Sequence, residues 1–318
     1  MTLDIVDFHN HHVPTAFTPT TLLHAPSNQQ ARWEAINTLL ADEDALVAAT
    51  HAGDISARVV NIPTALIADQ QGRVPPGTEQ RINDLLADLV ARHSGRVIGL
   101  ASIDAYSGDA GGREVERAVQ QLGLRGIFVD SASGDDFIDA PIARPTLAAA
   151  AELGVPVFVH PINPPLSRKL ATYGRVGTLY ARGTSNAAAL VALIEGGVFD
   201  ELPGLKTVFT NLAIGGLLLS GAFAGPRPDG TDITTLLRRH VHIDTMGFNP
   251  ILLRAAVALL GAQNVLIGSD WPIVDTGPLR GRVEQLLSDA GVAEHTDRRA
   301  IAGGNARRLL LTPERASA

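Results

Sequence analysis

The chain has 318 residues, of which 45% are hydrophobic, and 33 acidic against 26 basic side chains give it a formal net charge of −7. A chain of this size can bury a large core and matches a single-domain α/β barrel, so we expect one domain over residues 1–318.

The basic residues form no cluster that could follow a phosphate backbone, which excludes nucleic acid as an expected partner. No apolar run approaches the ~18 residues of a membrane span and no secretion signal opens the chain, so we expect a cytoplasmic protein with no membrane partner. Cysteine is absent, so any metal must be held by nitrogen and oxygen.

The first apolar run, residues 3–6, leads into the sequence DFHNH at residues 7–11. Alternate residues of a β-strand point to the same face, so His9 and His11 can share one metal ion. A polar loop that happens to be rich in histidine is the alternative, because His12 follows directly and the His-X-His motif is short. The other ligands must therefore be sought elsewhere in the chain.

Short apolar runs alternate with amphipathic stretches along the whole sequence. Eight candidate strands span residues 3–8, 57–62, 96–103, 124–129, 156–160, 205–210, 241–244 and 265–269. Helical spacing of apolar residues lies between them, over residues 79–92, 112–122, 142–153, 185–196, 251–260 and 279–290. Eight apolar strands separated by helices predict a (β/α)8 TIM barrel of the α/β class. A doubly wound open sheet is the alternative, but its first strand usually leads into a glycine-rich phosphate turn rather than into histidines.

Two further ligand types stand at predicted strand ends. Strand five ends at His160 and strand eight is followed by Asp270, while irregular stretches at residues 13–30 and 161–184 are expected at the same mouth of the barrel. Taken singly, His160 is equally well a capped histidine before a proline, and Asp270 a turn residue. Together with the first-strand histidines they predict a divalent metal site of three imidazoles and one carboxylate.

Four segments of the chain resemble the metal-dependent amidohydrolase superfamily, and within it the amidohydrolase-2 branch that includes aminocarboxymuconate-semialdehyde decarboxylase. They read DFHNH at residues 7–11, VFVHP at 157–161, GSDWP at 268–272 and GNARRL at 304–309. The resemblance implies a (β/α)8 barrel with one catalytic divalent metal, usually zinc, with manganese as the alternative. Its implied ligands are His9, His11, His160 and Asp270.

The chain departs from this branch at the end of strand six, where the branch has a histidine. Residues 205–216 read LKTVFTNLAIGG, which places Asn211 there, and no histidine lies between His160 and His240. An asparagine can donate a hydrogen bond to a developing oxyanion but cannot accept a proton near neutral pH. Asp270 then remains as the proton acceptor at the metal. A side chain that only caps the following backbone is the alternative for Asn211.

These features favour a metal-dependent hydrolase, in which metal-activated water attacks an amide, ester or lactone, Asp270 accepts the proton and Asn211 steadies the intermediate. Two alternatives stay open. One is a nonoxidative decarboxylase that acts on an aromatic or unsaturated carboxylic acid at the same metal. The other is a catalytically weakened member that only binds its ligand.

The segment of residues 161–186 contains four basic and no acidic side chains, so we expect a small anionic substrate, a carboxylate or aromatic acid derivative. Its binding residues are expected among Arg168, Arg175, Tyr173 and Trp271, and the expected assembly is a homodimer. Two carboxylates are candidates for orienting a ligand imidazole. Asp7 lies on the inward face below His9 if the first strand is regular, and Asp244 ends strand seven.

Overall fold

Eight parallel strand positions form a closed ring in the computed structural model, which describes residues 2–23, 25, 29–69, 74–225, 227, 229–274 and 277–310. In chain order the strands are β1 (Val6–His11), β2 (Ala57–Asn61), β3 (Val97–Gly99) continued by β4 (Ala101–Ser102), β5 (Ile127–Asp130), β8 (Val157–His160), β9 (Thr207–Phe209), β10 (Val241–Asp244) and β11 (Val265–Leu266). Each pairs in parallel with the next. The ring closes where the Phe8 amide donates to the Ile267 carbonyl at 2.7 Å and Asn10 bridges to Trp271. The predicted TIM barrel is confirmed.

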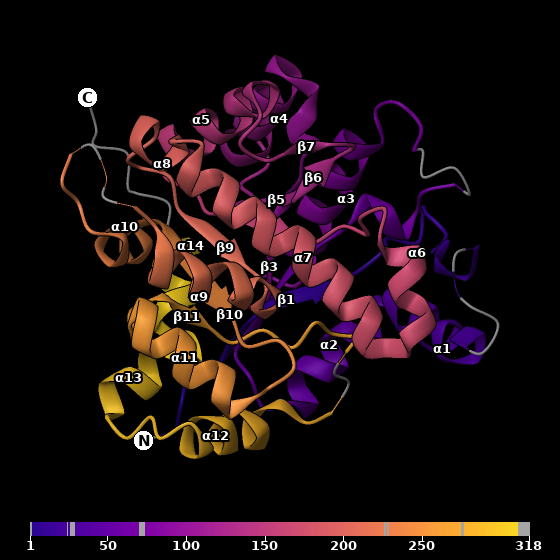
Figure 1. Ribbon diagram of the computed structural model, residues 1–318. Coiled ribbons are helices and arrows are strands. Elements are labelled where there is room, and N and C mark those ends of the chain that lie inside the picture. The colour runs from indigo at the N-terminus through magenta and orange to yellow at the C-terminus, as the bar shows by residue number, and fades with distance from the viewer. Residues whose placement is uncertain are drawn as a thin grey trace, which may run out of the picture.

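Helices surround this ring, as Figure 1 shows. They are α1 (Gln30–Leu40), α2 (Glu43–Ala52), α3 (Thr78–Arg92), α4 (Asp109–Gln120), α5 (Arg144–Glu152), α6 (Ser167–Leu170), α7 (Gly174–Glu195), α8 (Val198–Glu201), α9 (Ile214–Phe223), α10 (Ile233–His240), α11 (Pro250–Leu260), α12 (Leu279–Asp289), α13 (His295–Arg299) and α14 (Asn305–Leu310). A short hairpin, β6 (Ala132–Ser133) and β7 (Asp136–Phe137), follows β5. None of these helices is long and apolar enough to cross a membrane.

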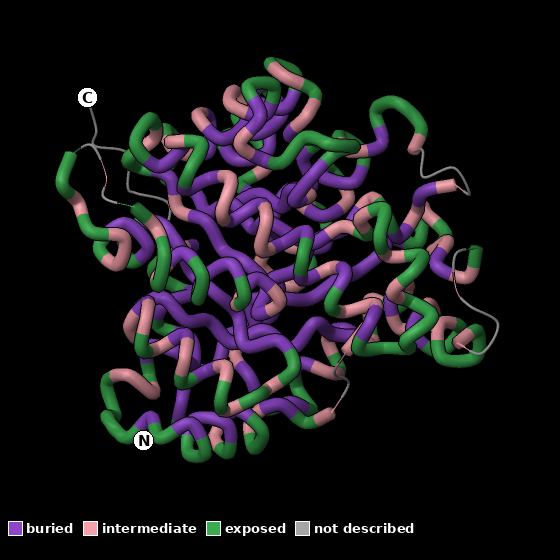
Figure 2. The backbone as a smooth tube through the Cα atoms, in the orientation of Figure 1, coloured by how far each residue is buried: buried purple, intermediate pink, exposed green. Residues whose placement is uncertain are grey.

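Alternation along the strands separates two apolar layers. Val59 belongs to a small cluster inside the barrel, whereas its neighbour Val60 belongs to the large core between the strands and the helices. The inner cluster contains three phenylalanine rings, with Phe8 and Phe128 each edge-on to Phe158 at centroid distances of 5.8 and 5.7 Å. Figure 2 shows the resulting buried centre and exposed periphery. The packed interior supports the strand ends from below.

The prediction that residues 161–184 are irregular is wrong over most of this segment. Helix α6 begins at Ser167 and α7 begins at Gly174, so α7 is 22 residues long and starts well before the predicted helix of residues 185–196. The glycines in the first turns of α7 hide its helical pattern in the sequence. A Cβ at Gly177 would lie 2.0 Å from the Leu170 carbonyl oxygen, so close packing demands glycine inside this helix despite its poor helix propensity.

Strand β1 carries a β-bulge between Asp7 and Asn10, where the register with β2 gains one residue. Val6 and Phe8 point into the barrel below the bulge, and His9 and His11 point into it above the bulge. Asp7 therefore lies on the outer face, and the expectation that it lies inward below His9 is wrong because the strand is not regular.

Candidate active site

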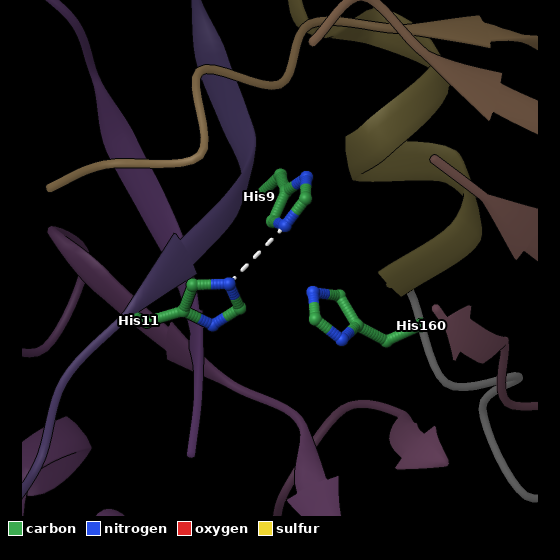
Figure 3. A group of neighbouring side chains, drawn as sticks. All are labelled: His9, His11 and His160. Atoms are coloured by element: carbon green, nitrogen blue, oxygen red, sulfur yellow. Dashed lines mark hydrogen bonds between the residues drawn. The ribbon is translucent and has the colours of Figure 1, made fainter. Parts of the chain in front are cut away.

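Three histidines converge at the C-terminal mouth of the barrel. His9 and His11 come from the end of β1 and His160 from the end of β8, and their ligand nitrogens all lie within 4.8 Å of one another. Figure 3 shows the three imidazoles turned toward a common point. All three side chains are buried. The predicted strand-end geometry thus brings together residues that are up to 151 positions apart in the sequence.

Two neighbouring acceptors set which nitrogen of each first-strand histidine carries its proton. His9 Nδ1 lies 2.6 Å from the carboxylate of Asp244, and His11 Nδ1 lies 2.7 Å from the side-chain oxygen of Asn61. With Nδ1 donating, the lone pair of each Nε2 faces the centre of the site. Asp244 is thereby one of the two carboxylates expected to orient a ligand.

The donor set fits a divalent cation. The Nε2 atoms of His9 and His11 lie 3.3 Å apart, where two lone pairs repel unless a positive charge lies between them. That distance is also about 3.3 Å for two nitrogens at 2.0–2.1 Å from a tetrahedral metal. Asp270 Oδ1 lies 3.5 Å from His9 Nε2 and 3.1 Å from His11 Nε2. This buried oxygen accepts no hydrogen bond from the described part of the chain, which leaves it available as a fourth ligand.

Asp270 reaches the histidines through an unusual backbone conformation. Its φ is +57°, in the left-handed region that side chains other than glycine rarely adopt. The Asp270 amide donates to the His9 carbonyl at 2.9 Å, which ties this turn to β1. At Gly268 a Cβ would lie 2.8 Å from Asp244 Cβ and 2.9 Å from His9 Cβ. Only glycine there lets the segment after β11 approach this closely.

The electrostatics of the site differ from one ligand to the next. Burial, reinforced by the charge of Arg182, holds the pKa of His160 well below its usual value, so this imidazole is neutral. Burial also lowers the pKa of His11. Burial favours the neutral acid at Asp270, but His9, His11 and Arg182 together hold its pKa below the ordinary value. Burial also opposes protonation of His9, but the charges of Asp270 and Asp244 raise its pKa above the ordinary value. The site therefore favours neutral imidazole at His11 and His160, an ionised carboxylate at Asp270 and a proton on His9 that a bound cation would displace.

A cavity of about 190 Å³ lies at the ends of β2, β4 and β5, and none of the three histidines lines it. Phe128 forms its wall on the histidine side, with its ring centroid 4.9 Å from that of His160. The rest of the lining combines apolar and small polar side chains with three acidic ones, Glu79, Asp104 and Asp130. Burial raises the pKa of Asp130 to about 6 and that of Glu79 to about 7. The sequence did not predict this cavity, because its residues lie on three separate strand ends and one helix.

The four residues expected to bind substrate are not gathered at the histidines. Arg168, Tyr173 and Arg175 are exposed on or next to helices α6 and α7. Trp271 is 2% exposed and packs in the core beneath the guanidinium of Arg58, with 5.4 Å from the guanidinium carbon to the ring centroid. The basic residue of this segment that does interact with the site is Arg182. Its charge acts on His160, Asp130 and Asp270.

Asn211 lies directly after β9 and is buried beside Asp244. Its backbone amide donates to Asp244 Oδ1 at 2.8 Å, and its side-chain Nδ2 donates to the Met246 carbonyl at 3.2 Å. The other oxygen of Asp244 accepts from His9. Asn211 thus contacts the metal site through Asp244, and its side chain is engaged with the backbone after β10.

The family model described as amidohydrolase matches residues 6–311 of the chain. The chain belongs to the amidohydrolase family. This amidohydrolase is 28% identical over 247 residues to the 2-amino-3-carboxymuconate-6-semialdehyde decarboxylase of Dictyostelium discoideum, an alignment that covers 73% of this chain and 66% of the relative, just under two thirds. It is 27% identical over 253 residues to the gamma-resorcylate decarboxylase of Polaromonas sp., with 73% and 76% covered.

A solved structure gives the same fold. The dihydroxybenzoic acid decarboxylase from Polaromonas sp., with bound manganese and the inhibitor 2-nitroresorcinol, superposes with a TM-score of 0.80 at 23% identity and covers 98% of this chain and 97% of its own. At that identity the likeness establishes the barrel. The curated relatives are carboxy-lyases, so they agree better with the decarboxylase alternative than with the hydrolase placed first from the sequence.

Proposed function

We propose that this amidohydrolase is a metal-dependent, nonoxidative decarboxylase of a small hydroxylated aromatic acid. We also propose that the whole chain forms the one domain that carries this activity. The observation that carries the proposal is the convergence of three imidazoles, with an Asp270 oxygen 3.1 Å from His11 Nε2, in a family whose curated relatives include a gamma-resorcylate decarboxylase. Manganese and zinc both suit imidazole and carboxylate ligands. A cation held by His9, His11, His160 and Asp270 would bind substrate oxygens and stabilise the negative charge that develops when carbon dioxide leaves.

The residues of the chain supply the proton transfer. Loss of carbon dioxide breaks the bond between the ring and the carboxyl carbon and leaves the electron pair on the ring carbon, which must gain one proton. Asp270 is ionised and faces the centre of the site, so it can accept a proton from a substrate hydroxyl and return it to that carbon. The phenolate left behind then takes the net proton from solvent.

The shape and polarity of the cavity at the ends of β2, β4 and β5 support a ring-sized substrate. Its volume of about 190 Å³ is below the roughly 300–1,000 Å³ of pockets for drug-sized ligands. Phe128 offers an apolar wall, and the carboxylates of Asp130 and Asp104 can accept hydrogen bonds from ring hydroxyls. A hydroxylated aromatic acid satisfies both surfaces.

The test is carbon dioxide release from a panel of mono- and dihydroxybenzoates and unsaturated acids by the metal-loaded protein. We expect release from at least one hydroxybenzoate with no hydrolysis of the corresponding esters, amides or lactones. Ester or lactone hydrolysis without carbon dioxide release would restore the hydrolase. Metal binding with neither reaction would favour the ligand-binding member.

We further propose that Arg182 binds the substrate carboxylate in place of the exposed Arg168 and Arg175. Helix α7 docks on the barrel rim where Ser185 Oγ lies 2.7 Å from Ser131 Oγ and Asn186 Nδ2 donates to the Val159 carbonyl at 2.9 Å. Arg182 precedes these residues by three and four positions, so it lies on the same face of the helix. Its Nη1 contacts Asn163 Oδ1 at 3.4 Å, near the end of β8.

An Arg182→Met enzyme is expected to show a KM raised by about 10–100-fold with a smaller change in kcat, because a charge-assisted hydrogen bond contributes ~1.5–3 kcal/mol. Arg168→Met is the matched control and should stay within about twofold of wild type. Steady-state kinetics on the best acid of the panel measures both. An unchanged KM in Arg182→Met would contradict the assignment.

Asn211 is proposed as a positioning residue that holds Asp244 against His9. An Asn211→Ala enzyme loses the side-chain bond to Met246 but keeps the backbone bond to Asp244, so we expect a fall in kcat of about tenfold or less. Asn211→His tests whether the missing strand-six base matters. A gain in rate and a new ionisation near pH 6–7 in the pH–rate profile would show that a histidine base at this position matters. Unchanged rates would show that this position takes no part in catalysis.

The dimer expected from the sequence is retained as a proposal. Val176 and Tyr180 on α7 and Phe223 on the adjacent α9 are 78%, 69% and 81% exposed, as is typical of helices that meet another protein surface. Light scattering on the purified protein measures the mass, and a monomer would refute the proposal.

A further inference from the structure

A buried ion pair lies directly behind the metal site, on the outer face of the barrel wall. Arg58 of β2 is 1% exposed and Asp7 of β1 is fully buried, and Arg58 Nη1 donates to Asp7 Oδ2 at 2.6 Å. A charge pair this deep is costly to desolvate, and replacing such pairs by apolar residues is often neutral for stability. Stability alone therefore gives a weak reason for these two residues.

The pair joins two of the three segments that carry the metal-site side chains, β1 and the segment after β11. On the β1 side, Arg58 Nη1 also donates to Asn10 Oδ1, and Asn10 Nδ2 spans the bulge to the carbonyls of Asp7 and Val59 at 2.9 and 3.2 Å. On the other side, Asp7 accepts from the Ser269 amide at 2.9 Å and from the Ser269 hydroxyl at 2.6 Å. Every one of these contacts lies outside the ring of metal-site atoms.

The contacted residues alternate with the metal-site residues along the chain. Asn10 stands between His9 and His11, and Ser269 and Trp271 stand on either side of Asp270. Residues 9–11 are extended, so neighbours there point to opposite faces and fixing Asn10 fixes where His9 and His11 point. Asp270 is not in an extended segment, but both of its chain neighbours are held on the outer side. Trp271 adds to this, because its amide donates to Ser269 Oγ at 3.2 Å and its ring faces the Arg58 guanidinium.

Asp270 is the residue that most needs such support. Its left-handed backbone is unfavourable for an aspartate, and an unfavourable conformation persists only where surrounding contacts determine it. The Ser269 amide and hydroxyl, held by Asp7, fix the residue that immediately precedes Asp270. Without them Asp270 could relax to an ordinary conformation and withdraw its carboxylate from the histidines.

We infer that Asp7 and Arg58 are positioning residues that hold Asp270 in register with His9 and His11, and so set the affinity of the site for its divalent cation. This inference rests on the metal-dependent function proposed above. Partners that orient metal ligands typically change metal affinity by 10–100-fold when they are replaced.

The principal test is the double variant Asp7→Asn/Arg58→Met, which removes both charges together and so leaves no uncompensated buried ion. Ser269→Ala removes the hydroxyl bond to Asp7 while it leaves the amide bond and the ion pair in place. The matched control is Glu114→Gln/Arg117→Met, which removes the ion pair on helix α4, where Arg117 Nε donates to Glu114 Oε2 at 2.8 Å. For each protein we would measure the Mn²⁺ and Zn²⁺ dissociation constants by chelator competition, and urea unfolding of the metal-free form.

We expect the double variant to raise the metal dissociation constant by about 10–100-fold and Ser269→Ala to raise it by about threefold or more, with the control within about twofold. At saturating Mn²⁺ the double variant should still show a reduced kcat, because Asp270 is displaced, with KM changed less. Wild-type affinity in both Ser269→Ala and a folded double variant would overturn the inference, and wild-type affinity in Ser269→Ala alone would do so if the double variant failed to fold. Wild-type protein that bound neither metal would instead overturn the proposed function, and this inference with it.

Discussion

An Asp270→Asn enzyme is expected to lose about 10²–10⁴-fold in kcat, because its side chain is the proton carrier that faces the centre of the site. Asparagine keeps the size of the side chain and one oxygen that can still contact a metal, but it cannot take up a proton. The assay is carbon dioxide release by the variant, with its metal content measured on the same sample. A full metal content with a lost rate separates proton transfer from metal binding.

The control for this variant is His12→Ala. His12 follows the two predicted ligands in sequence, but it lies outside the histidine group, and burial lowers its pKa to about 4. We expect kcat within about threefold of wild type. An Asp270→Asn enzyme that retained most of its activity would contradict the assignment of Asp270 as the proton carrier. A large loss in Asp130→Asn beside a small one in Asp270→Asn would transfer the role to Asp130, a carboxyl group at this mouth whose pKa burial raises to about 6.

The barrel and its histidines could be read from the sequence because both rest on short-range regularities. Strands that are apolar on both faces predict a parallel sheet covered by helices, and residues at the strand ends must meet at one mouth of the barrel. His9 and His160 are 151 positions apart, yet their places at the ends of strands one and five were enough to associate them. His9 and His11 point to the same face, as expected for alternate residues of a strand, because the bulge lies before His9.

What the sequence could not give depends on tertiary packing. The bulge in β1 exchanges the faces of Asp7 and the residues after it, and no periodic pattern reveals where an extra residue is accommodated. Trp271 reads as an aromatic wall of the mouth, but it turns outward onto Arg58. Arg182 belonged to the basic segment noted in the sequence, yet choosing it over Arg168 required knowing that α7 begins at Gly174 and which of its faces docks on the barrel.

His160→Ala is expected to lose the metal almost completely and, with it, activity to the limit of detection. The wild-type protein should carry about one equivalent of zinc or manganese, because imidazole nitrogens and a carboxylate are ligands that such an ion takes. Removing the imidazole that comes from β8 leaves His9, His11 and Asp270, all from one side of the ring, and opens the site to water. Elemental analysis of the purified proteins measures the content directly.

The exposed His51 provides the matched histidine control, and His51→Ala should keep the wild-type metal content and rate. Chelator treatment of the wild type should reproduce the His160→Ala result reversibly, since added Mn²⁺ or Zn²⁺ restores the ion that the His9 and His11 lone pairs require. Metal should also raise the unfolding free energy, by about 2.7 kcal/mol at a free concentration 100 times the dissociation constant. A full metal content in His160→Ala would mean that the three imidazoles meet for packing rather than for coordination, and the reaction proposed for this barrel would lose its basis.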